Sequence, residues 1–383
     1  MDASPGLRFD EYVTPWSRDS IGNVATLQRG FDLPKHSRIK GSVPIVSSGG
    51  ITGRHNVSKV APPGIVTGRY GSIGELYFLD EPFWPLNTSL WVKNFHGNDE
   101  LFCFYLLSRV DLKSLSDKTG VPGINRNDVH KIPTAVPSVA EQKKIAEFLG
   151  AMDEKIRLLQ SRHEQITLYK KGIMQKIFTQ TLRFKADDGN DFPDWEFKKL
   201  GEVFERVTRK NVEDDQNVLT ISGQLGLINQ REYFNKSVSS KDVTGYYLIK
   251  NGEFAYNKSY SKGYPMGAIK RLNRYEQGVV STLYICFQTP AEISAKFYEQ
   301  FFEGGGLIHE LSKIAQEGAR NHGLLNISVV EFFKDIKIPF PSTSEQQKIA
   351  DFLSAIDEKI EAVSAQIENM QSFKKGLLQQ MFV

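Results

Sequence analysis

Two stretches decide the fold: EQKKIAEFLGAMDEKI at residues 141–156 and EQQKIADFLSAIDEKI at residues 345–360. They open longer segments, 141–178 and 345–382, that align without a gap at an offset of 204 residues. A repeat of this kind has to be recognised before any fold is inferred, because it changes what one structural unit is. The 383-residue chain is therefore interpreted as two similar halves.

Each repeated segment is predicted to be a long helix, because its apolar residues recur at alternating spacings of four and three. The two stripes are Ile145, Leu149, Met152, Ile156, Leu159, His163, Ile166, Lys170, Ile173 and Ile177, then Ile349, Leu353, Ile356, Ile360, Val363, Ile367, Met370, Lys374, Leu377 and Met381. Both are interrupted by a lysine at the same place. Each helix should start at a capping box directly after a proline, as Ser138-x-x-Glu141 and Ser342-x-x-Glu345 indicate.

A strict seven-residue stripe favours packing on another helix, and the obvious partner is the other copy. About 38 residues at 1.5 Å each give roughly 57 Å of helix. Since a variable region joins the end of the first helix to the start of the second, an antiparallel pair is expected; the alternative is that each helix packs only on its own head. The predicted organisation is a head at 1–137, a spacer helix at 138–181, a second head at 182–341 and a C-terminal spacer helix at 342–383.

Both heads are predicted to be divergent copies of one α+β fold, which gives the chain a pseudo-two-fold internal repeat. Short strands are expected at 64–67, 75–78 and 89–92 in the first head and, in corresponding order, at 244–249, 252–256 and 281–285 in the second. Helical stretches are expected around 98–115 and 291–315. Each half also opens with a related pattern: Leu7-Arg8-Phe9 with Trp16, and Leu182-Arg183-Phe184 with Trp195.

Composition excludes several classes of protein. With 48 basic and 45 acidic residues the net charge is +3, which neither requires nor excludes a nucleic-acid partner. No stretch approaches the roughly 20 apolar residues of a membrane span, and the opening MDASPGLRFDEYV has no export-signal pattern. Cys103 and Cys286 lie in apolar runs and fit a reducing compartment. A cytoplasmic protein without a membrane segment is therefore expected.

No motif predicts an active site, a cofactor site or a metal site. The chain has no phosphate-binding G-x-x-x-x-G-K-[ST] loop, no H-E-x-x-H, no Cys-x-x-Cys and no Asn/Asp-Pro-Pro-aromatic signature of amino-methyltransferases. Gly68-x-x-Gly71-x-x-Gly74 has the wrong spacing for a dinucleotide loop and precedes a predicted strand. His163 lies on the helical stripe, where an interface role is favoured over catalysis.

The loops of both heads are rich in glycine, serine, aromatic and basic residues. This mixture is typical of a nucleic-acid surface, where lysine and backbone N–H groups hold phosphates while arginine, asparagine and glutamine read base edges; it also occurs in ordinary surface turns. The candidate DNA-binding residues are Ser48, Arg54, Arg69, Tyr70 and Ser72 in the first head and Gln224, Lys258, Tyr260, Lys262 and Arg320 in the second.

Taken in order, the repeated motifs resemble those of the specificity subunit of type I restriction-modification systems, over essentially the whole chain. The resemblance rests on the LRF…W…(L/I)G-x-V starts, the Gly68 to Leu90 stretch and the Pro-Ser-x-x-Glu-Gln-x-Lys-Ile-Ala helix starts. It implies that each head is a target recognition domain reading one half of a bipartite sequence in double-stranded DNA. It also implies that the helices set the unread gap between the halves and that the subunit itself is not catalytic.

The resemblance further implies two modification (methyltransferase) subunits and, in the full complex, restriction (helicase-nuclease) subunits. S-adenosylmethionine, Mg²⁺ and ATP would then be bound by those partners and none by this chain. Candidate partner-binding residues, with a cap or solvated face as the alternative, are Glu141, Gln142, Lys155, Glu345, Gln346 and Lys359. The competing class is a non-catalytic coiled-coil adaptor whose two heads bind protein or glycan.

Overall fold

A computed structural model describes residues 4–116, 123–234, 242–260, 263–315 and 325–383. The chain forms two compact units, each described here by itself. Unit 1 comprises Met1–Ser161 and Val363–Val383, and unit 2 comprises Arg162–Ala362. Each unit therefore contains one head together with part of both long helices.

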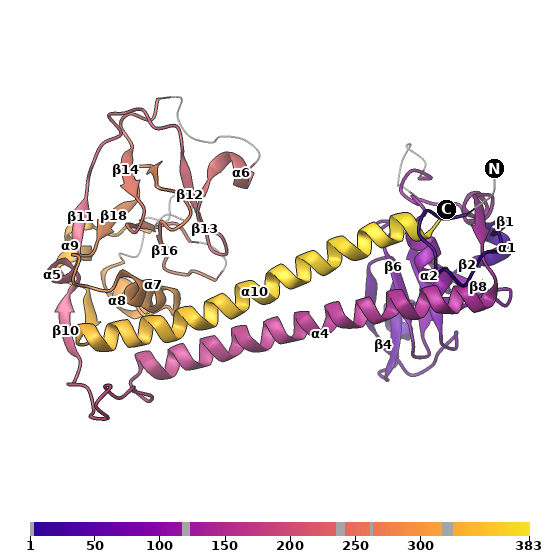
Figure 1. The fold of residues 1–383 in the computed structure, drawn as a ribbon, viewed down its shortest axis with the longest axis horizontal. Coiled ribbons are helices and arrows are strands. Elements are labelled where there is room, and N and C mark those ends of the chain that lie inside the picture. The colour runs from indigo at the N-terminus through magenta and orange to yellow at the C-terminus, as the bar shows by residue number, and fades with distance from the viewer. Residues whose placement is uncertain (1–3, 117–122, 235–241, 261–262, 316–324) are drawn as a thin grey trace. The chain divides into compact units, whose positions relative to one another are not determined.

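The two long helices begin where the sequence predicts. Helix α4 spans Val139–Phe178 and helix α10 spans Thr343–Met381 (Figure 1). The Ser138 hydroxyl accepts the backbone N–H of Glu141 at 3.4 Å, and the Ser342 hydroxyl accepts that of Glu345 at 3.3 Å. The serine half of each predicted capping box is thus confirmed. The glutamate half is wrong, because both carboxylates are bound elsewhere, as described below.

The helices pack against each other in antiparallel directions. In unit 1 the first part of α4 meets the last part of α10, where Lys374 Nζ lies 2.5 Å from Asp153. In unit 2 the last part of α4 meets the first part of α10, where Lys170 Nζ lies 2.6 Å from Asp357. All twenty stripe residues are buried or half-buried. The alternative that each helix packs only on its own head is therefore wrong.

The head of unit 1 is built on three antiparallel or mixed sheets. The central one has strand order β2-β8-β5-β6, the second has order β4-β3-β7, and β1 pairs with β9. The elements are β1 Ser17–Ser20, α1 Ile21–Val24, β2 Thr26–Arg29, η1 Lys35–Ser37, β3 Val43–Ser47, β4 Gly50–His55, β5 Gly64–Gly68, β6 Leu76–Leu79, β7 Trp84–Pro85, β8 Ser89–Asn94, α2 Glu100–Ser108, α3 Arg126–His130 and β9 Pro133–Val136.

The head of unit 2 repeats that plan. Its central sheet has order β11-β18-β15-β16, β10 pairs with β19, and β12-β13 and β14-β17 form two further antiparallel pairs. The elements are β10 Glu196–Lys199, α5 Leu200–Val203, β11 Glu205–Val207, β12 Leu219–Ser222, β13 Gly226–Asn229, α6 Gln230–Phe234, β14 Tyr247–Lys250, β15 Phe254–Asn257, β16 Ala268–Arg271, β17 Gln277–Val280, β18 Ile285–Gln288, α7 Ala295–Glu303, α8 Ile308–Ile314, α9 Val329–Lys334 and β19 Lys337–Phe340.

The α+β repeat is confirmed, but the predicted correspondence of strands needs correction. Strands β5, β6 and β8 of unit 1 match β15, β16 and β18 of unit 2 by their places in the central sheets. The expected strand at 244–249 is instead β14, which pairs with β17 outside that sheet, and the strand expected at 281–285 begins only at Ile285. Short apolar runs mark strands without indicating which sheet they join. The helical stretches shorten to α2 in unit 1 and to α7 and α8 in unit 2.

Each head core is completed by the end of a long helix. Leu377, Met381 and Phe382 are buried in the core of unit 1, where the Phe382 ring stacks on Phe102 at 5.3 Å between centroids. Met174 and Ile177 are buried in the core of unit 2. Burying these apolar side chains stabilises both the head and the helix end. Each head is therefore packed on both helices of its unit.

Candidate nucleic-acid interface

The turn between β3 and β4 carries the first candidate residue. The Ser47 hydroxyl donates to the carbonyl oxygen of Gly50 at 3.1 Å and accepts the N–H of Gly49 at 3.2 Å. These bonds fix a compact turn in which Ser48 is half-buried and Gly49 is exposed. The turn therefore presents a hydroxyl and backbone groups at the edge of the β4-β3-β7 sheet.

A second loop, Gly68 to Gly74, follows β5 and holds three more candidates. The N–H groups of Arg69 and Tyr70 donate to the Thr88 carbonyl at 2.9 and 3.3 Å. Gly71 and Gly74 have φ values of 75° and 87°, in a region that side chains disfavour, which explains glycine at both places. The Arg69 guanidinium lies over the Tyr70 ring at 4.7 Å, and Ser72 is exposed.

The structure brings these two loops together. A Cβ placed on Gly71 would lie 3.7 Å from Ser48 Oγ, and one placed on Gly49 would lie 3.6 Å from Ser72 Oγ. Ser48, Arg69, Tyr70 and Ser72 thus form one cluster, the head 1 loop cluster. Arg54 is placed differently: on β4, it pairs with Glu81 at 3.5 Å and hydrogen-bonds the Ser42 carbonyl, so its charge is partly compensated.

In unit 2 the candidates do not form one described cluster. Gln224 is exposed in the turn between β12 and β13, and Tyr260 is 65% exposed after β15. Lys258 is half-buried and its Nζ donates to the Ile327 carbonyl at 3.4 Å. Burial lowers the pKa of Lys258 from its ordinary value. Lys262 and Arg320 lie outside the described residues.

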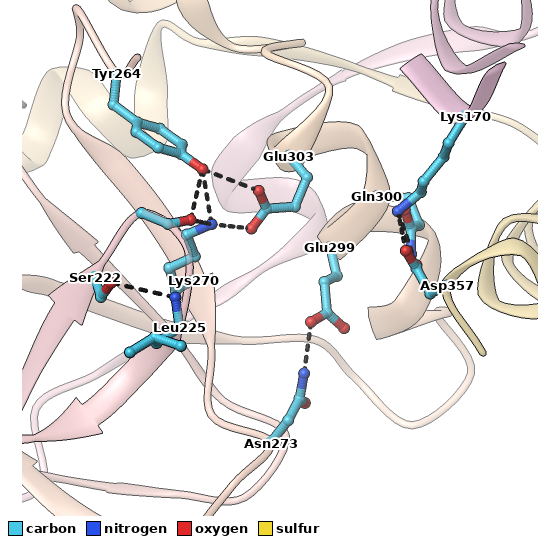
Figure 2. Close-up of polar contacts among 11 residues, drawn as sticks. Lys170, Ser222, Leu225, Tyr264, Lys270, Asn273, Glu299, Gln300, Glu303 and Asp357 are labelled. Atoms are coloured by element: carbon cyan, nitrogen blue, oxygen red, sulfur yellow. Dashed lines mark hydrogen bonds and ion pairs between the residues drawn. The ribbon is translucent and has the colours of Figure 1, made fainter. Parts of the chain in front are cut away.

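Unit 2 also has a groove that sequence reasoning missed. It has a volume of about 1420 Å³ and runs between the 222–226 turn, α7 and the parts of α4 and α10 in this unit. Figure 2 shows three sets of polar contacts along it: Tyr264 and Glu303 around Lys270, Asn273 with Glu299, and Lys170 and Gln300 with Asp357. The one sequence feature that could have indicated this groove is the basic run Lys270-Arg271-Leu272-Asn273-Arg274, which matches no known binding motif.

The carboxylates of Glu299 and Asp357, which line the groove, are hydrogen-bonded or ion-paired to neighbouring side chains. Glu299 accepts a hydrogen bond from Asn273 Nδ2 at 2.6 Å and pairs with Arg271 at 3.4 Å. Burial raises the pKa of Glu299, while the Arg271 charge works in the opposite direction. Gln300 Nε2 donates to Asp357 at 2.8 Å, so the groove wall and the helix pair are joined.

Four candidate partner-binding residues are buried inside the chain. Glu141 accepts hydrogen bonds from Arg8 at 2.7 Å and from Trp16 Nε1 at 3.2 Å. Its copy Glu345 accepts from Arg183 at 2.9 and 3.2 Å and from Trp195 Nε1 at 2.9 Å. The arginine and tryptophan of each Leu-Arg-Phe…Trp pattern therefore bind the glutamate of the following helix, which explains why these residues are repeated.

The two glutamines are used in the same way. Gln142 accepts the N–H of Asp99 at 2.9 Å and donates to the Pro137 carbonyl at 3.0 Å. Gln346 accepts the N–H of Ser294 at 3.2 Å and donates to the Pro341 carbonyl at 2.9 Å. A partner contact through these four side chains would need them at the surface, and that expectation is corrected. The other two candidates, Lys155 and its copy Lys359, are exposed.

The described residues offer little for catalysis. They contain no group of three or more His, Cys, Asp or Glu side chains placed to hold a metal ion. Burial raises the pKa of both Cys103 and Cys286 to about 12, so neither is a thiolate at neutral pH. In the same part of the chain, no helix combines the length and the apolar character that crossing a bilayer needs.

The described fold is a duplicated α+β head with exposed polar loops, attached to paired helices. The family described as "Type I restriction modification DNA specificity domain" matches residues 14–168 and 193–370, so the chain belongs to that family. It is a DNA specificity subunit of a type I restriction-modification system and not itself an enzyme. Of the two function classes left open by the sequence, DNA specificity is confirmed and the adaptor is not.

Relatives agree with that assignment. The chain is 28% identical over 306 residues to the type I restriction enzyme MjaVIII specificity subunit of Methanocaldococcus jannaschii, covering 73% of this chain and 68% of the relative. A putative MjaX specificity subunit of the same organism is 23% identical over 323 residues, covering 76% and 69%. The crystal structure of an S subunit from M. genitalium has a TM-score of 0.63 at 18% identity, covers 99% of both chains and supports the fold.

Proposed function

We propose that each head reads one half of a bipartite sequence in double-stranded DNA and that the α4 and α10 pair sets the unread gap. The observation that carries this proposal is the duplication itself. Both heads have the same central-sheet topology, yet their exposed turns differ in sequence. A repeated framework with divergent turns fits two related readers with different targets.

The first reader is proposed to use the head 1 loop cluster. The Arg69 guanidinium suits guanine O6 and N7, and the Ser48 and Ser72 hydroxyls suit either bases or phosphates. Stacking on the Tyr70 ring restricts the guanidinium, which favours one binding geometry. In unit 2 the exposed Gln224 and Tyr260 are the corresponding candidates, with Lys262 and Arg320 remaining predictions.

The partners are proposed to be two modification subunits, one on each pseudo-symmetric half of the helix pair, with restriction subunits joining the full complex in the cytoplasm. Tyr169 and Phe373 support this proposal: they occupy equivalent positions of the repeat and are 54% and 59% exposed. Large apolar side chains left exposed at equivalent places suit equivalent partners. The exposed Lys155 and Lys359 lie on the same helices. S-adenosylmethionine, Mg²⁺ and ATP are assigned to these partners.

Methylation-aware sequencing of a host genome, with and without this gene, tests the function. Deletion should remove one split adenine-methylated motif. Replacing residues 182–341 by the second head of another specificity subunit should then change one half-site and leave the other unchanged. Loss of no motif, or a change in both half-sites after the exchange, would refute the modular reading.

The docking proposal has its own test. Tyr169→Ala and Phe373→Ala should each reduce the number of modification subunits that native mass spectrometry finds on this chain. Arg157→Ala is the matched control, because Arg157 is an exposed helical residue that pairs only locally with Glu154 at 2.6 Å. Equal stoichiometry in all three variants would contradict docking at the two aromatic positions.

A further inference from the structure

The backbone of the turn Ser222 to Gly226, which joins β12 to β13, is hydrogen-bonded by side chains from other elements. Its tip presents Gln224, which is exposed, and Leu225, which is 55% exposed. On the opposite side, the Gly223 carbonyl accepts hydrogen bonds from the Tyr264 hydroxyl and from Lys270 Nζ, both at 2.9 Å (Figure 2). Within the turn, the Leu225 N–H donates to Ser222 Oγ at 3.2 Å.

Lys270 is the centre of this arrangement. It lies on β16, is 6% exposed, and its ammonium also donates to the Tyr264 hydroxyl at 3.0 Å and to Glu303 at the end of α7. An ammonium has three N–H donors, and each has an acceptor here. A buried cation is tolerated only when it is paired and hydrogen-bonded in this way. The position of Lys270 is therefore set by these three contacts within unit 2.

The Tyr264 ring adds a steric constraint on the same turn. A Cβ placed on Gly223 would lie 2.6 Å from Cε2 of that ring, so the ring touches the backbone of the turn directly. The ammonium of Lys270 lies 4.9 Å from the ring centroid. The turn is thus fixed by one steric contact and two hydrogen bonds, all from residues outside it.

We propose that Lys270, with Tyr264 and Glu303, is a positioning residue that aims Gln224 and Leu225 at an A·T pair in the half-site of the second head. This inference rests on the proposed function, because it assumes that the second head reads DNA. A glutamine amide can bond adenine N6 and N7 together, and an apolar side chain beside it can contact the thymine methyl group. Two hydrogen bonds of this kind require a fixed amide, which a free turn would not provide.

Stability alone is a weaker explanation of the Lys270 cluster. Replacing a buried ion pair by apolar residues is often neutral or stabilising, so such a pair is poor evidence for a stabilising role. The alternative use of buried ionic groups is to fix one geometry. Here the fixed element is a turn whose tip is exposed, which is the position where a fixed geometry would matter for recognition.

The experiment uses the intact complex of this chain with its modification subunits. Methylation rates are measured on a DNA library in which every base pair of both half-sites is varied. Gln224→Ala should reduce discrimination about tenfold at one A·T pair of the second half-site. Lys270→Met should reduce discrimination at that same pair to a similar extent, and the double variant should lose no more there than Gln224→Ala alone.

A second variant with a matched control covers the case in which Lys270→Met does not fold. Glu303→Gln removes the charge that pairs with Lys270. Glu253→Gln makes the same change on another ion-paired carboxylate of unit 2, which instead pairs with Arg209 at 3.0 Å. Glu303→Gln should reduce discrimination at the base pair that Gln224 contacts, and Glu253→Gln should leave that discrimination unchanged.

Three results would overturn the proposal: unchanged discrimination in an assembled Glu303→Gln complex, a loss spread evenly over the half-site, or additive losses in the double variant. Failure of the proposed function would show differently. The wild-type complex would then have no second half-site at all, whatever residue stands at position 270.

Discussion

Replacing Arg183 by methionine should destabilise unit 2 by about 3 kcal/mol. Glu345 is 0% exposed and accepts two hydrogen bonds from Arg183, at 3.2 and 2.9 Å. Removing one partner of a buried pair costs roughly 3–5 kcal/mol, because the other charge remains buried. Arg183 is 23% exposed and Trp195 still donates to the carboxylate at 2.9 Å, which places the expected loss at the lower end of that range.

Peptide-resolved amide hydrogen exchange is the suitable assay, since two units need not unfold together. A loss of about 3 kcal/mol should speed exchange of the most protected peptides of β15 and β18 roughly 100-fold and leave unit 1 unchanged. Arg157→Met is the control: Arg157 and its partner Glu154 are both exposed to solvent, so its exchange rates should stay close to those of the wild-type chain. Similar losses of stability in the two variants would refute the conclusion that the buried Glu345 carboxylate depends on Arg183.

Three further outcomes are expected. Asp153→Ala should destabilise unit 1 by about 1–3 kcal/mol in the same assay, because its carboxylate accepts from a tyrosine of α2 at 2.7 Å and a lysine of α10 at 2.5 Å. The control Glu154→Ala removes an exposed carboxylate and should leave exchange close to that of the wild-type chain. Burial, with help from a nearby arginine, lowers the pKa of His130, whose neutral ring accepts a backbone N–H at 2.8 Å. The contribution of His130 to the stability of unit 1 is therefore present above the unfolded pKa of about 6.5 and is lost as the pH falls through the folded pKa. In His130→Gln, the stability of unit 1 measured by exchange should therefore change less between about pH 7.5 and pH 5.5 than it does in the wild-type chain. Inserting seven residues after Ser161 and seven before Val363 keeps the heptad register and lengthens the helix pair by roughly 10.5 Å. Methylation-aware sequencing should then find a gap about three base pairs longer between unchanged half-sites. A gap of unchanged length would contradict the proposal that the helix pair sets it.

The long helices were predictable because their signals are local. Period, proline and serine cap all lie within the helix or directly before it, and α4 and α10 begin where those signals place them. The lysine interruptions of the stripes were visible too, but their reason was not. Lys170 and Lys374 each pair with an aspartate of the opposite helix, and that partner follows only from the antiparallel register.

The glutamates at the helix starts were misjudged for a related physical reason. A Ser-x-x-Glu pattern predicts a carboxylate that returns to its own helix N-terminus. In the structure a half-buried arginine and a tryptophan N–H compete for that carboxylate, and charge-assisted bonds from arginine are the stronger ones. The sequence contained the clue, since Arg8 and Trp16 are repeated with Glu141, but nothing in one sequence indicates that repeated residues touch.

The candidate interface was predictable only in part. Glycine-rich loops identified the head 1 loop cluster, because glycine marks turns that a side chain would strain. They did not identify Lys270, which lies in a strand and carries no turn signal. Its relevance comes from contacts with Gly223, Tyr264 and Glu303, which lie on three separate elements and meet only in the folded unit.

The repeated arginine, tryptophan and helix-start glutamate gather where the two ends of each head meet. In unit 2, β10 near the start of the head pairs with β19 at its end, and Arg183 and Trp195 bind Glu345 just beyond that end. In unit 1, β1 pairs with β9 in the same way, and Arg8 and Trp16 bind Glu141. Each head is thus closed at its base by residues that need not change when its distant turns do. Divergence of the turns with retention of the base follows from this arrangement, and it is why the sequence repeats at the helix starts and varies where the DNA is proposed to bind.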